Sequence, residues 1–454
     1  MMLRSINPAD GSTLKTFTGF SEADAKRALA HAAAAAPAWA ALPVAERRAA
    51  MLRAAQVLRV RREEFARLIT QEMGKLIQEA RAEIDKCVWG CEYYAERAAA
   101  FLAEEEIETD AGRSYVAYEP LGTVLAVMPW NFPFWQVFRA AAPMLMAGNT
   151  MLLKHASNVP QCALAIEGVF KEAGFPEAVF QTLLIPAAMV ARVVEDDRVH
   201  AVTLTGSEAA GREVAAVAGA HLKKTVLELG GSDAFVVLED AALDDAVRHA
   251  VASRFQNAGQ SCVAAKRFVV VESVAQDFVQ RLKRAVEGLR MGDPMNEATT
   301  LGPLARHDLR DALHQQVLES IARGAVAVTG CAPEGGPGAF YQASILDRVR
   351  PGMPAYEEEL FGPVAAIIRA KDEADALRIA NDSRFGLGGS VWTADVARGE
   401  RMARQLQCGV VFVNGMVKSD PRLPFGGVKH SGYGRELAVY GIREFVNVKT
   451  VWIR

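Results

Sequence analysis

Short apolar segments alternate with longer amphipathic segments in a regular order between residues 123 and 229. This strand–helix–strand order predicts an α/β fold built on a parallel sheet with helices on both faces. Ligands of such sheets bind beyond the carboxyl ends of the strands, so a binding site is expected along that edge. The predicted strands are 123–128, 150–154, 179–185, 201–205 and 225–229, and the predicted helices between them are 134–146, 159–173, 187–195 and 208–222.

A second alternation of the same kind starts at Asp233 and runs to about His430, which predicts a second α/β unit. An alanine-rich helical region precedes the first alternation. It starts at a capping signal at Ser21 and is expected to be broken at Pro37 and Pro43. For a chain of 454 residues, two or three domains are expected.

Two further stretches, 114–119 and 444–454, are typical of strands without a covering helix. Paired with each other, they would form a ribbon with an exposed edge, and such an edge commonly recruits another subunit. The resulting division is a domain of residues 1–112 and 121–230, a second domain of residues 231–430, and an oligomerisation segment of residues 113–120 and 431–454.

The charge balance argues against nucleic acid and anionic membranes as partners, since 51 Lys and Arg residues stand against 54 Asp and Glu, a net charge of −3. No run of about 20 apolar residues occurs, so no membrane-spanning helix is expected. Six cysteines without a C-x-x-C pair fit a reducing cytoplasm, and neither a disulfide scaffold nor a metal site is expected. Cys87 and Cys91 are expected to pack on one helix face.

The most informative cysteine is Cys262, at the end of the segment NAGQSC. The glycine turn before it lets the backbone approach a ligand closely. Exposed backbone N–H groups can lower the pKa of a thiol and make it a nucleophile. The alternative for a lone cysteine is a buried, inert core thiol.

Two polar residues at the ends of predicted strands could act with such a nucleophile. Glu228 in VLELGG is flanked by leucines, so partial desolvation should raise its pKa and suit it to general-base chemistry. Asn131 lies between the prolines of PWNFP, and its amide can donate to a developing oxyanion. The alternatives are a solvated glutamate at a strand end and an asparagine that caps a rigid turn.

The segment TGSEAAG at residues 205–211 follows a predicted strand and opens a predicted helix. A helix N-terminus in this position can bind phosphate. The segment matches neither a nucleotide-triphosphate loop nor a G-x-G-x-x-G fingerprint, so it carries little weight alone.

In chain order, the sequence carries PWNFP, LLKHAS, TGSEAAG, LELGG, NAGQSC, EELFGPV and PFGGVKHSGYGRE. Together these segments resemble the aldehyde dehydrogenase superfamily over essentially the whole chain. The segments FWQVFR, LLKHASNVPQCA and NGMVKSDPRLPFGG are most similar to the bacterial NAD(P)-dependent succinate-semialdehyde dehydrogenases. The resemblance implies a Rossmann-type cofactor domain, a second α/β catalytic domain and a small β ribbon that joins subunits into a homodimer or homotetramer.

The resemblance assigns Cys262 as the nucleophile that attacks an aldehyde carbonyl to give a thiohemiacetal. The Asn131 amide and the Cys262 N–H would hold the oxyanion. Hydride transfer to the nicotinamide would leave a thioester, and Glu228 would activate the water that hydrolyses it. Because a relative that acylates coenzyme A needs no such base, Glu228 favours release of a free acid.

The resemblance also implies a dinucleotide across the first sheet. Lys154 would reach the adenosine ribose, and Ser157 stands where relatives restricted to NAD often have glutamate. Because serine does not repel a 2′-phosphate, NADP is expected to be preferred and NAD accepted. Pro186 stands where glycine is common, so a differently shaped adenine-side pocket is expected. The other expected cofactor contacts are Trp130, Gly206, Ser207, Leu229, Glu359 and Phe361.

For the substrate, the resemblance implies a carboxylate site around Arg139, eight residues after Asn131 on the following helix. A guanidinium suits a carboxylate through a bidentate pair. Without the resemblance, Arg139 would be placed on a helix surface. Ser419 resembles a second carboxylate contact, and Trp135 and Ser261 complete the expected site, with a core role as the alternative for Trp135.

The leading hypothesis is therefore oxidation of succinate semialdehyde to succinate. Some relatives have arginine six residues before the cysteine, where this chain has Gln256. That difference keeps open a broad aliphatic-aldehyde or glutarate-semialdehyde dehydrogenase. A third hypothesis is a catalytically silent relative with a binding or structural role. The joint presence of Cys262, Glu228 and Asn131 argues against it.

Overall fold

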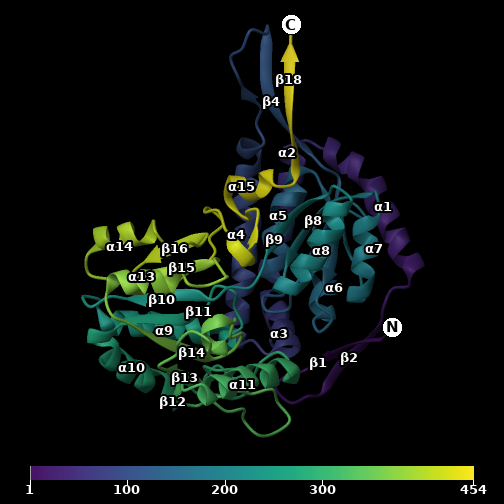
Figure 1. The fold of residues 1–454 in the computed structure, drawn as a ribbon. Helices are drawn as coiled ribbons and strands as arrows, with labels where there is room; N and C mark the ends of the chain where they lie inside the picture. The colour runs from purple at the N-terminus through teal and green to yellow at the C-terminus, as the bar shows by residue number, and fades with distance from the viewer. Residues whose placement is uncertain (1) are drawn as a thin grey trace.

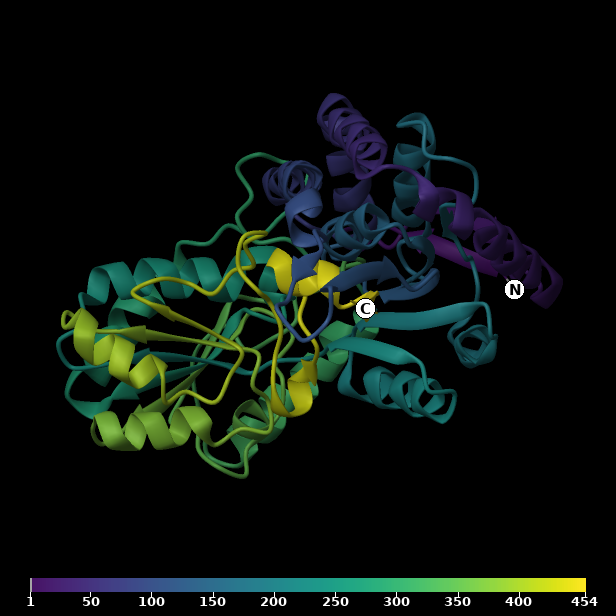
Figure 2. The same cartoon turned by 90° about the horizontal axis from the view of Figure 1, so that it is seen from above.

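The computed structural model describes residues 2–454 and shows two sheet-based lobes, with a narrow β ribbon projecting beyond them (Figure 1). Seen from above, the C-terminal part of the chain lies between the two lobes (Figure 2). Both lobes are α/β, which confirms the predicted fold class.

The first lobe is built on a six-stranded sheet in the order β17–β9–β8–β5–β6–β7. All neighbouring strands pair in parallel except β17, which pairs antiparallel with β9. Its strands are β5 (Thr123–Met128), β6 (Thr150–His155), β7 (Phe180–Thr182), β8 (Val199–Thr205), β9 (Lys224–Glu228) and β17 (Gly432–Tyr433).

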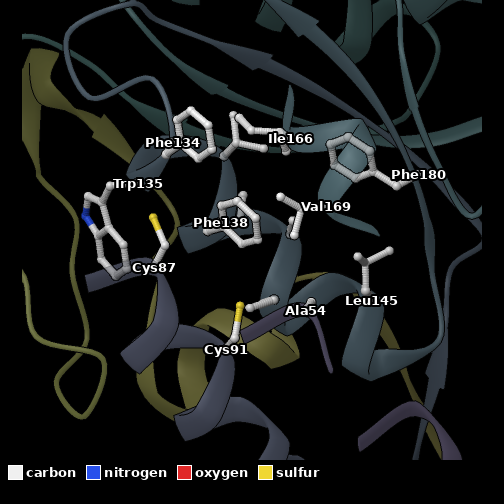
Figure 3. Close-up of a cluster of buried hydrophobic side chains, with 14 of the residues drawn as sticks. Ala54, Cys87, Cys91, Phe134, Trp135, Phe138, Leu145, Ile166, Val169 and Phe180 are labelled. Carbon is white, nitrogen blue, oxygen red and sulfur yellow. The ribbon is translucent and has the colours of Figure 1, made fainter. Parts of the chain in front are cut away.

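Helices cover both faces of this sheet, as predicted. Successive side chains of β5 alternate between the faces, so Val124 and Ala126 join one apolar cluster while Leu125 joins another. The helices of this lobe are α1 (Glu22–Ala41), α2 (Val44–Val60), α3 (Arg62–Met73), α4 (Ile77–Phe101), α5 (Trp135–Ala147), α6 (Pro160–Glu172), α7 (Val190–Glu195) and α8 (Glu208–Ala220). Figure 3 shows that Cys87 and Cys91 point from α4 into the larger cluster, which confirms their shared helix face.

The second lobe is built on a seven-stranded sheet in the order β12–β13–β14–β11–β10–β15–β16. The strands are β10 (Asp233–Val237), β11 (Ala265–Val271), β12 (Val326–Thr329), β13 (Ser344–Asp347), β14 (Val364–Ala370), β15 (Gly388–Trp392) and β16 (Val410–Val413). The helices are α9 (Leu243–Phe255), α10 (Glu272–Glu287), α11 (His307–Ala322), α12 (Pro354–Glu357), α13 (Glu373–Asn381) and α14 (Val396–Ala403). Only β12 runs antiparallel to its neighbour, so a second parallel sheet forms as predicted.

The projecting ribbon pairs β4 (Arg113–Pro120) with β18 (Val446–Ile453) over their full lengths, and β3 (Glu105–Glu106) adds a short third strand. Trp452 is 50% exposed and Val448 is 59% exposed, so the ribbon carries apolar side chains in solvent. The segment from residue 431 also contains β17, which belongs to the first sheet, and α15 (Ala438–Arg443). A separate hairpin pairs β1 (Met2–Ile6) with β2 (Thr13–Thr18).

The N-terminal helices differ from the prediction at one of the two prolines. The predicted break at Pro37 is wrong, because α1 continues through it to Ala41. Beyond Pro37, Trp39 is buried and its Nε1 donates to the Leu145 carbonyl at 3.0 Å, which holds the last turn despite the missing backbone donor. Pro43 does separate α1 from α2, and the predicted cap forms, with the Ser21 side chain accepting from the Asp24 N–H.

The bend between α1 and α2 is 117°. Taken singly, no helix within residues 2–454 has the length and apolarity needed to cross a membrane, whereas this bent pair meets the same criteria by length and composition alone. The predicted strand 179–185 is also longer than β7, because the last bond to β6 runs from the Leu183 N–H to the Leu153 carbonyl, and the chain then leads to Pro186, whose φ is −69°.

Candidate active site

Cys262 lies after a strained turn that joins α9 to β11. Three consecutive residues adopt left-handed backbone conformations, with φ of 54° at Asn257, 50° at Ala258 and 75° at Gly259. A Cβ atom at Gly259 would overlap the Gly362 carbonyl, so the turn needs glycine both for its φ and for this close approach. Strain of this kind is concentrated at functional sites.

Lys266 holds the loop that carries the cysteine. Its Nζ donates to the carbonyl oxygens of Ser261 at 2.9 Å and Cys262 at 2.8 Å, and it pairs with Glu359 at 3.2 Å. The Cys262 N–H has no protein acceptor within residues 2–454. The carbonyl groups of this loop are therefore fixed, while one backbone donor beside the sulfur stays free.

Asn131 follows β5 and faces the same loop. Its Nδ2 donates to the Gln260 carbonyl at 3.1 Å, and its own carbonyl accepts from Asn257 Nδ2 at 2.8 Å. A carboxamide carries two N–H donors, so one remains after the bond to Gln260. The Asn131 amide and the Cys262 N–H can thus supply two donors to an oxyanion.

Glu228 ends β9 and is buried, with neither carboxylate oxygen hydrogen-bonded in the described chain. Burial raises the pKa of Glu228 to about 8, while the Arg139 charge acts in the opposite direction. Gly426 leaves room for the carboxylate, since a Cβ there would lie 2.6 Å from Oε1. A glutamate with a pKa near the working pH is suited to act as a general base.

The environment of Cys262 favours its neutral form. Burial raises the pKa of the Cys262 thiol to about 12, although the Arg139 and Lys266 charges act to lower it. The negative charges of Glu228 and Glu359 also act to raise this pKa. The thiol therefore needs a base at neutral pH.

A first cavity of about 270 Å³ runs from Cys262 toward the N-terminus of α8. Ser207 caps α8 by accepting from the Ala210 N–H at 3.3 Å. On the other wall, Phe361 packs edge-on against Trp130 with ring centroids 5.8 Å apart. Six of the predicted cofactor contacts line this cavity together with Asn131: Trp130, Gly206, Ser207, Leu229, Glu359 and Phe361.

The residues of the first cavity fit a dinucleotide. A helix N-terminus with a glycine before it suits a pyrophosphate, and at Gly206 an added Cβ would meet only the Leu204 side chain, at 3.5 Å. Gly211 lets α8 pack tightly on the sheet, because a Cβ there would lie 2.6 Å from Leu229. Glu359 is held by the Gly231 N–H at 3.1 Å, which fixes a carboxylate that can accept from ribose hydroxyls.

The other two predicted cofactor residues lie outside the first cavity. Lys154 is buried near the end of β6, and burial lowers the pKa of its ammonium group. Ser157 is exposed and lines a separate cavity of about 430 Å³ between the N-terminal hairpin and the start of α11. Leu309 of α11 lines the first cavity, so the start of this helix borders both spaces.

A second cavity of about 230 Å³ meets the first at Cys262. It contains every predicted substrate residue, and Gln256 as well. Arg139 in its wall is 2% exposed and forms an ion pair with Glu436, and its Nη2 donates to Thr205 Oγ1 at 3.2 Å. The predicted substrate residues in this cavity are Trp135, Arg139, Ser261 and Ser419.

Sequence reasoning missed three charged residues of the site. Lys86 lines the second cavity from α4, Lys266 supports the cysteine loop, and Glu436 pairs with Arg139. Glu436 belongs to the quoted segment GYGRE, and Lys266 lies four residues after Cys262, so each had a local signal. Lys86 had none, because nothing in a helical lysine indicates which surface it faces.

Comparison with known proteins agrees with this geometry. The Aldehyde dehydrogenase family model matches residues 1–451. The probable NADP+-dependent succinate-semialdehyde dehydrogenase of Synechocystis sp. is 52% identical over 453 residues, which cover 100% of both chains. The NAD(P)+-dependent succinate semialdehyde dehydrogenase of Escherichia coli is 48% identical over 99% of this chain and 97% of its own. The crystal structure of succinic semialdehyde dehydrogenase from Streptococcus pyogenes with NADP+ has a TM-score of 0.97 at 38% identity and covers 99% of each chain. The chain therefore belongs to the aldehyde dehydrogenase family.

Proposed function

We propose that this protein oxidises succinate semialdehyde to succinate, with NADP as the preferred cofactor and NAD accepted. The observation that carries the proposal is the position of Cys262, which lines both cavities at once. One cavity has the groups that suit a dinucleotide, and the other has cationic and hydroxyl groups that suit a carboxylate. Relatives at 48–52% identity carry the same activity in their names.

The reaction follows from the groups around the sulfur. The Cys262 thiol gives up its proton to solvent as its sulfur attacks the aldehyde carbon, and the Asn131 amide with the Cys262 N–H stabilises the oxyanion. A bound dinucleotide would accept the hydride that leaves this carbon, and loss of that hydride turns the adduct on Cys262 into a thioester. Glu228 then takes a proton from water, the resulting hydroxide attacks the thioester carbonyl, and the C–S bond breaks to release the acid. Burial of Glu228 keeps its pKa high enough to accept that proton.

The second cavity supports a substrate that ends in a carboxylate. Arg139 uses two of its five N–H donors on Glu436 and Thr205, so others remain for a ligand. Ser419 and Trp135 lie in the same wall. Gln256 provides no charge there, so a broader aldehyde range remains the second candidate.

Steady-state kinetics test the proposal. Succinate semialdehyde and butanal have equal carbon chains, and NADP and NAD differ only in the 2′-phosphate. We expect kcat/KM to be highest for succinate semialdehyde with NADP. Equal values for the two aldehydes would favour the broad aliphatic-aldehyde alternative.

Replacing Ser157 with glutamate is expected to lower kcat/KM for NADP at least about tenfold more than for NAD, because a carboxylate at this exposed position would repel the 2′-phosphate. Ser157→Ala is the matched variant, since it removes the hydroxyl without adding charge. Parallel titrations of both cofactors measure the effect. An equal loss for both cofactors in Ser157→Glu would show that Ser157 does not determine the choice between NADP and NAD.

Replacing Asn131 with alanine is expected to lower kcat about 100- to 1000-fold, the usual effect of removing one oxyanion donor. The bond to the Gln260 carbonyl is lost as well, so cofactor affinity and melting temperature serve as controls for the loop. Single-turnover measurement of NADPH formation reports the chemical step. A change confined to KM would mean that Asn131 binds substrate without stabilising the transition state.

We also propose that the β4–β18 ribbon joins subunits into a homodimer or homotetramer, with residues 113–120 and 431–454 as the oligomerisation segment. In this division, residues 1–112 and 121–230 form the cofactor domain, and residues 231–430 form the catalytic domain. The exposed Trp452 and Val448 support this role for the ribbon, since an apolar edge is commonly covered by another chain. We further propose that the protein is located in the cytoplasm. All six cysteines are free, which suits a reducing compartment.

A further inference from the structure

Lys86, Trp135 and Ser419 form a polar cluster in the wall of the second cavity. Lys86 comes from α4, Trp135 starts α5, and Ser419 lies in the long loop after β16. The Lys86 Nζ donates to Ser419 Oγ at 2.7 Å and lies 4.7 Å from the centre of the Trp135 ring. Trp135 Nε1 also donates to Ser419 Oγ, at 3.2 Å. Three separate elements thus meet at this cluster.

The O–H group of Ser419 has no hydrogen-bond acceptor in the described chain. A hydroxyl has two acceptor positions and one O–H donor. Lys86 and Trp135 occupy both acceptor positions, so the O–H must donate elsewhere. No acceptor for it occurs among residues 2–454. The other N–H donors of Lys86 likewise have no acceptor among residues 2–454. The cluster therefore offers several hydrogen-bond donors to a ligand that carries acceptor atoms.

Lys86 also differs from the other cations of this cavity because its charge is not compensated. Arg139 is ion-paired with Glu436, and Lys418 is exposed to solvent. Within the described chain, Lys86 forms no ion pair.

The two acids whose charges act on Lys86, Glu83 and Asp420, are held by other cations. Glu83 pairs with Lys75, and Asp420 pairs with Arg422 at 2.7 Å. Glu79, the other acid of the cavity wall, accepts the Asn257 N–H at 3.0 Å.

This environment disfavours a charged Lys86 when no anion is present. Burial, together with the nearby Arg139 charge, lowers the pKa of the Lys86 ammonium to about 8. A carboxylate placed beside Nζ would offset both effects.

We propose that Lys86, together with Ser419, binds the distal carboxylate of the substrate and is the residue that selects aldehydes ending in a carboxylate. This inference rests on the proposed function and deepens it. Lys86 supplies the uncompensated charge, and Ser419 supplies a neutral donor. Arg139 adds hydrogen bonds, while its charge balances Glu436.

Lys86→Met tests the assignment, since methionine keeps an unbranched side chain and removes the charge. We expect kcat/KM for succinate semialdehyde to fall about 10- to 100-fold, the usual range for a charge-assisted hydrogen bond, mainly through KM. The ratio of kcat/KM for succinate semialdehyde over butanal should fall by a similar factor. Lys86→Arg should restore most of that ratio, and Lys26→Met is the matched control for an exposed helical lysine of the same lobe that lines neither active-site cavity.

The outcomes separate the two proposals. A wild-type enzyme with no preference for succinate semialdehyde over butanal would overturn the proposed substrate. A wild-type preference that Lys86→Met retains would overturn the assignment of Lys86 alone. An equal loss for both aldehydes in Lys86→Met would also overturn it, because it would indicate a structural role. The dissociation constant of succinate, measured by calorimetry, should rise in Lys86→Met and stay unchanged in Lys26→Met.

Discussion

Replacing Cys262 with alanine is expected to abolish NADPH formation, with a loss of more than about 10⁴-fold in kcat, because no covalent intermediate can form. The loop itself should survive the change. Lys266 binds backbone carbonyls of Ser261 and Cys262, and the turn conformation depends on Asn257 to Gly259, so none of these contacts uses the sulfur. Cofactor affinity and melting temperature should stay close to those of the wild type.

Cys408→Ala provides the matched control, since Cys408 is also half-buried in the second lobe but lines neither active-site cavity. Its activity should be unchanged. Treatment with limiting substrate followed by iodoacetamide, with mass spectrometry as the readout, identifies the acylated thiol directly, because iodoacetamide modifies free thiols only. Substantial activity in Cys262→Ala would refute the assigned nucleophile and, with it, the covalent mechanism.

The first sheet could be predicted closely from the sequence because its signals are local. Strand β5 has the predicted bounds, since the apolar run VLAVM lies between Thr123 and the rigid PWNFP segment. The prediction failed at Pro37 because the packing of Trp39 against Leu145 lies more than 100 residues away in sequence. Tertiary contact outweighed a local helix-breaking signal there.

The same distinction applies to the site. The three residues to which we assign catalysis could be proposed from the sequence because each sits in a distinctive segment at a strand end or turn. The pairing of Arg139 with Glu436 was not, since it joins residues almost 300 apart in sequence and depends on the packing of the C-terminal segment between the lobes (Figure 2). A sequence can indicate that a cation faces a channel, but whether its charge is already compensated is decided by the fold.

Glu228→Gln is expected to separate the two halves of the reaction. Acylation should still release one NADPH per site as a rapid burst, while hydrolysis of the thioester slows about 100- to 10,000-fold without its general base. Because burial already favours the neutral carboxyl, and neither oxygen is hydrogen-bonded to the protein, glutamine should fit with little change in stability. Stopped-flow absorbance measures the burst, and mass spectrometry should find the acyl group on Cys262.

The pH dependence provides an independent check of the same role. A general base acts in its deprotonated form, so wild-type kcat should fall as pH decreases below about 8, the raised pKa of Glu228. The residual activity of Glu228→Gln should lack this step. If Glu228→Gln showed no burst while Cys262 kept its reactivity toward iodoacetamide, Glu228 would instead be required before hydride transfer. Its proximity to the neutral thiol would then make it the base that activates the sulfur.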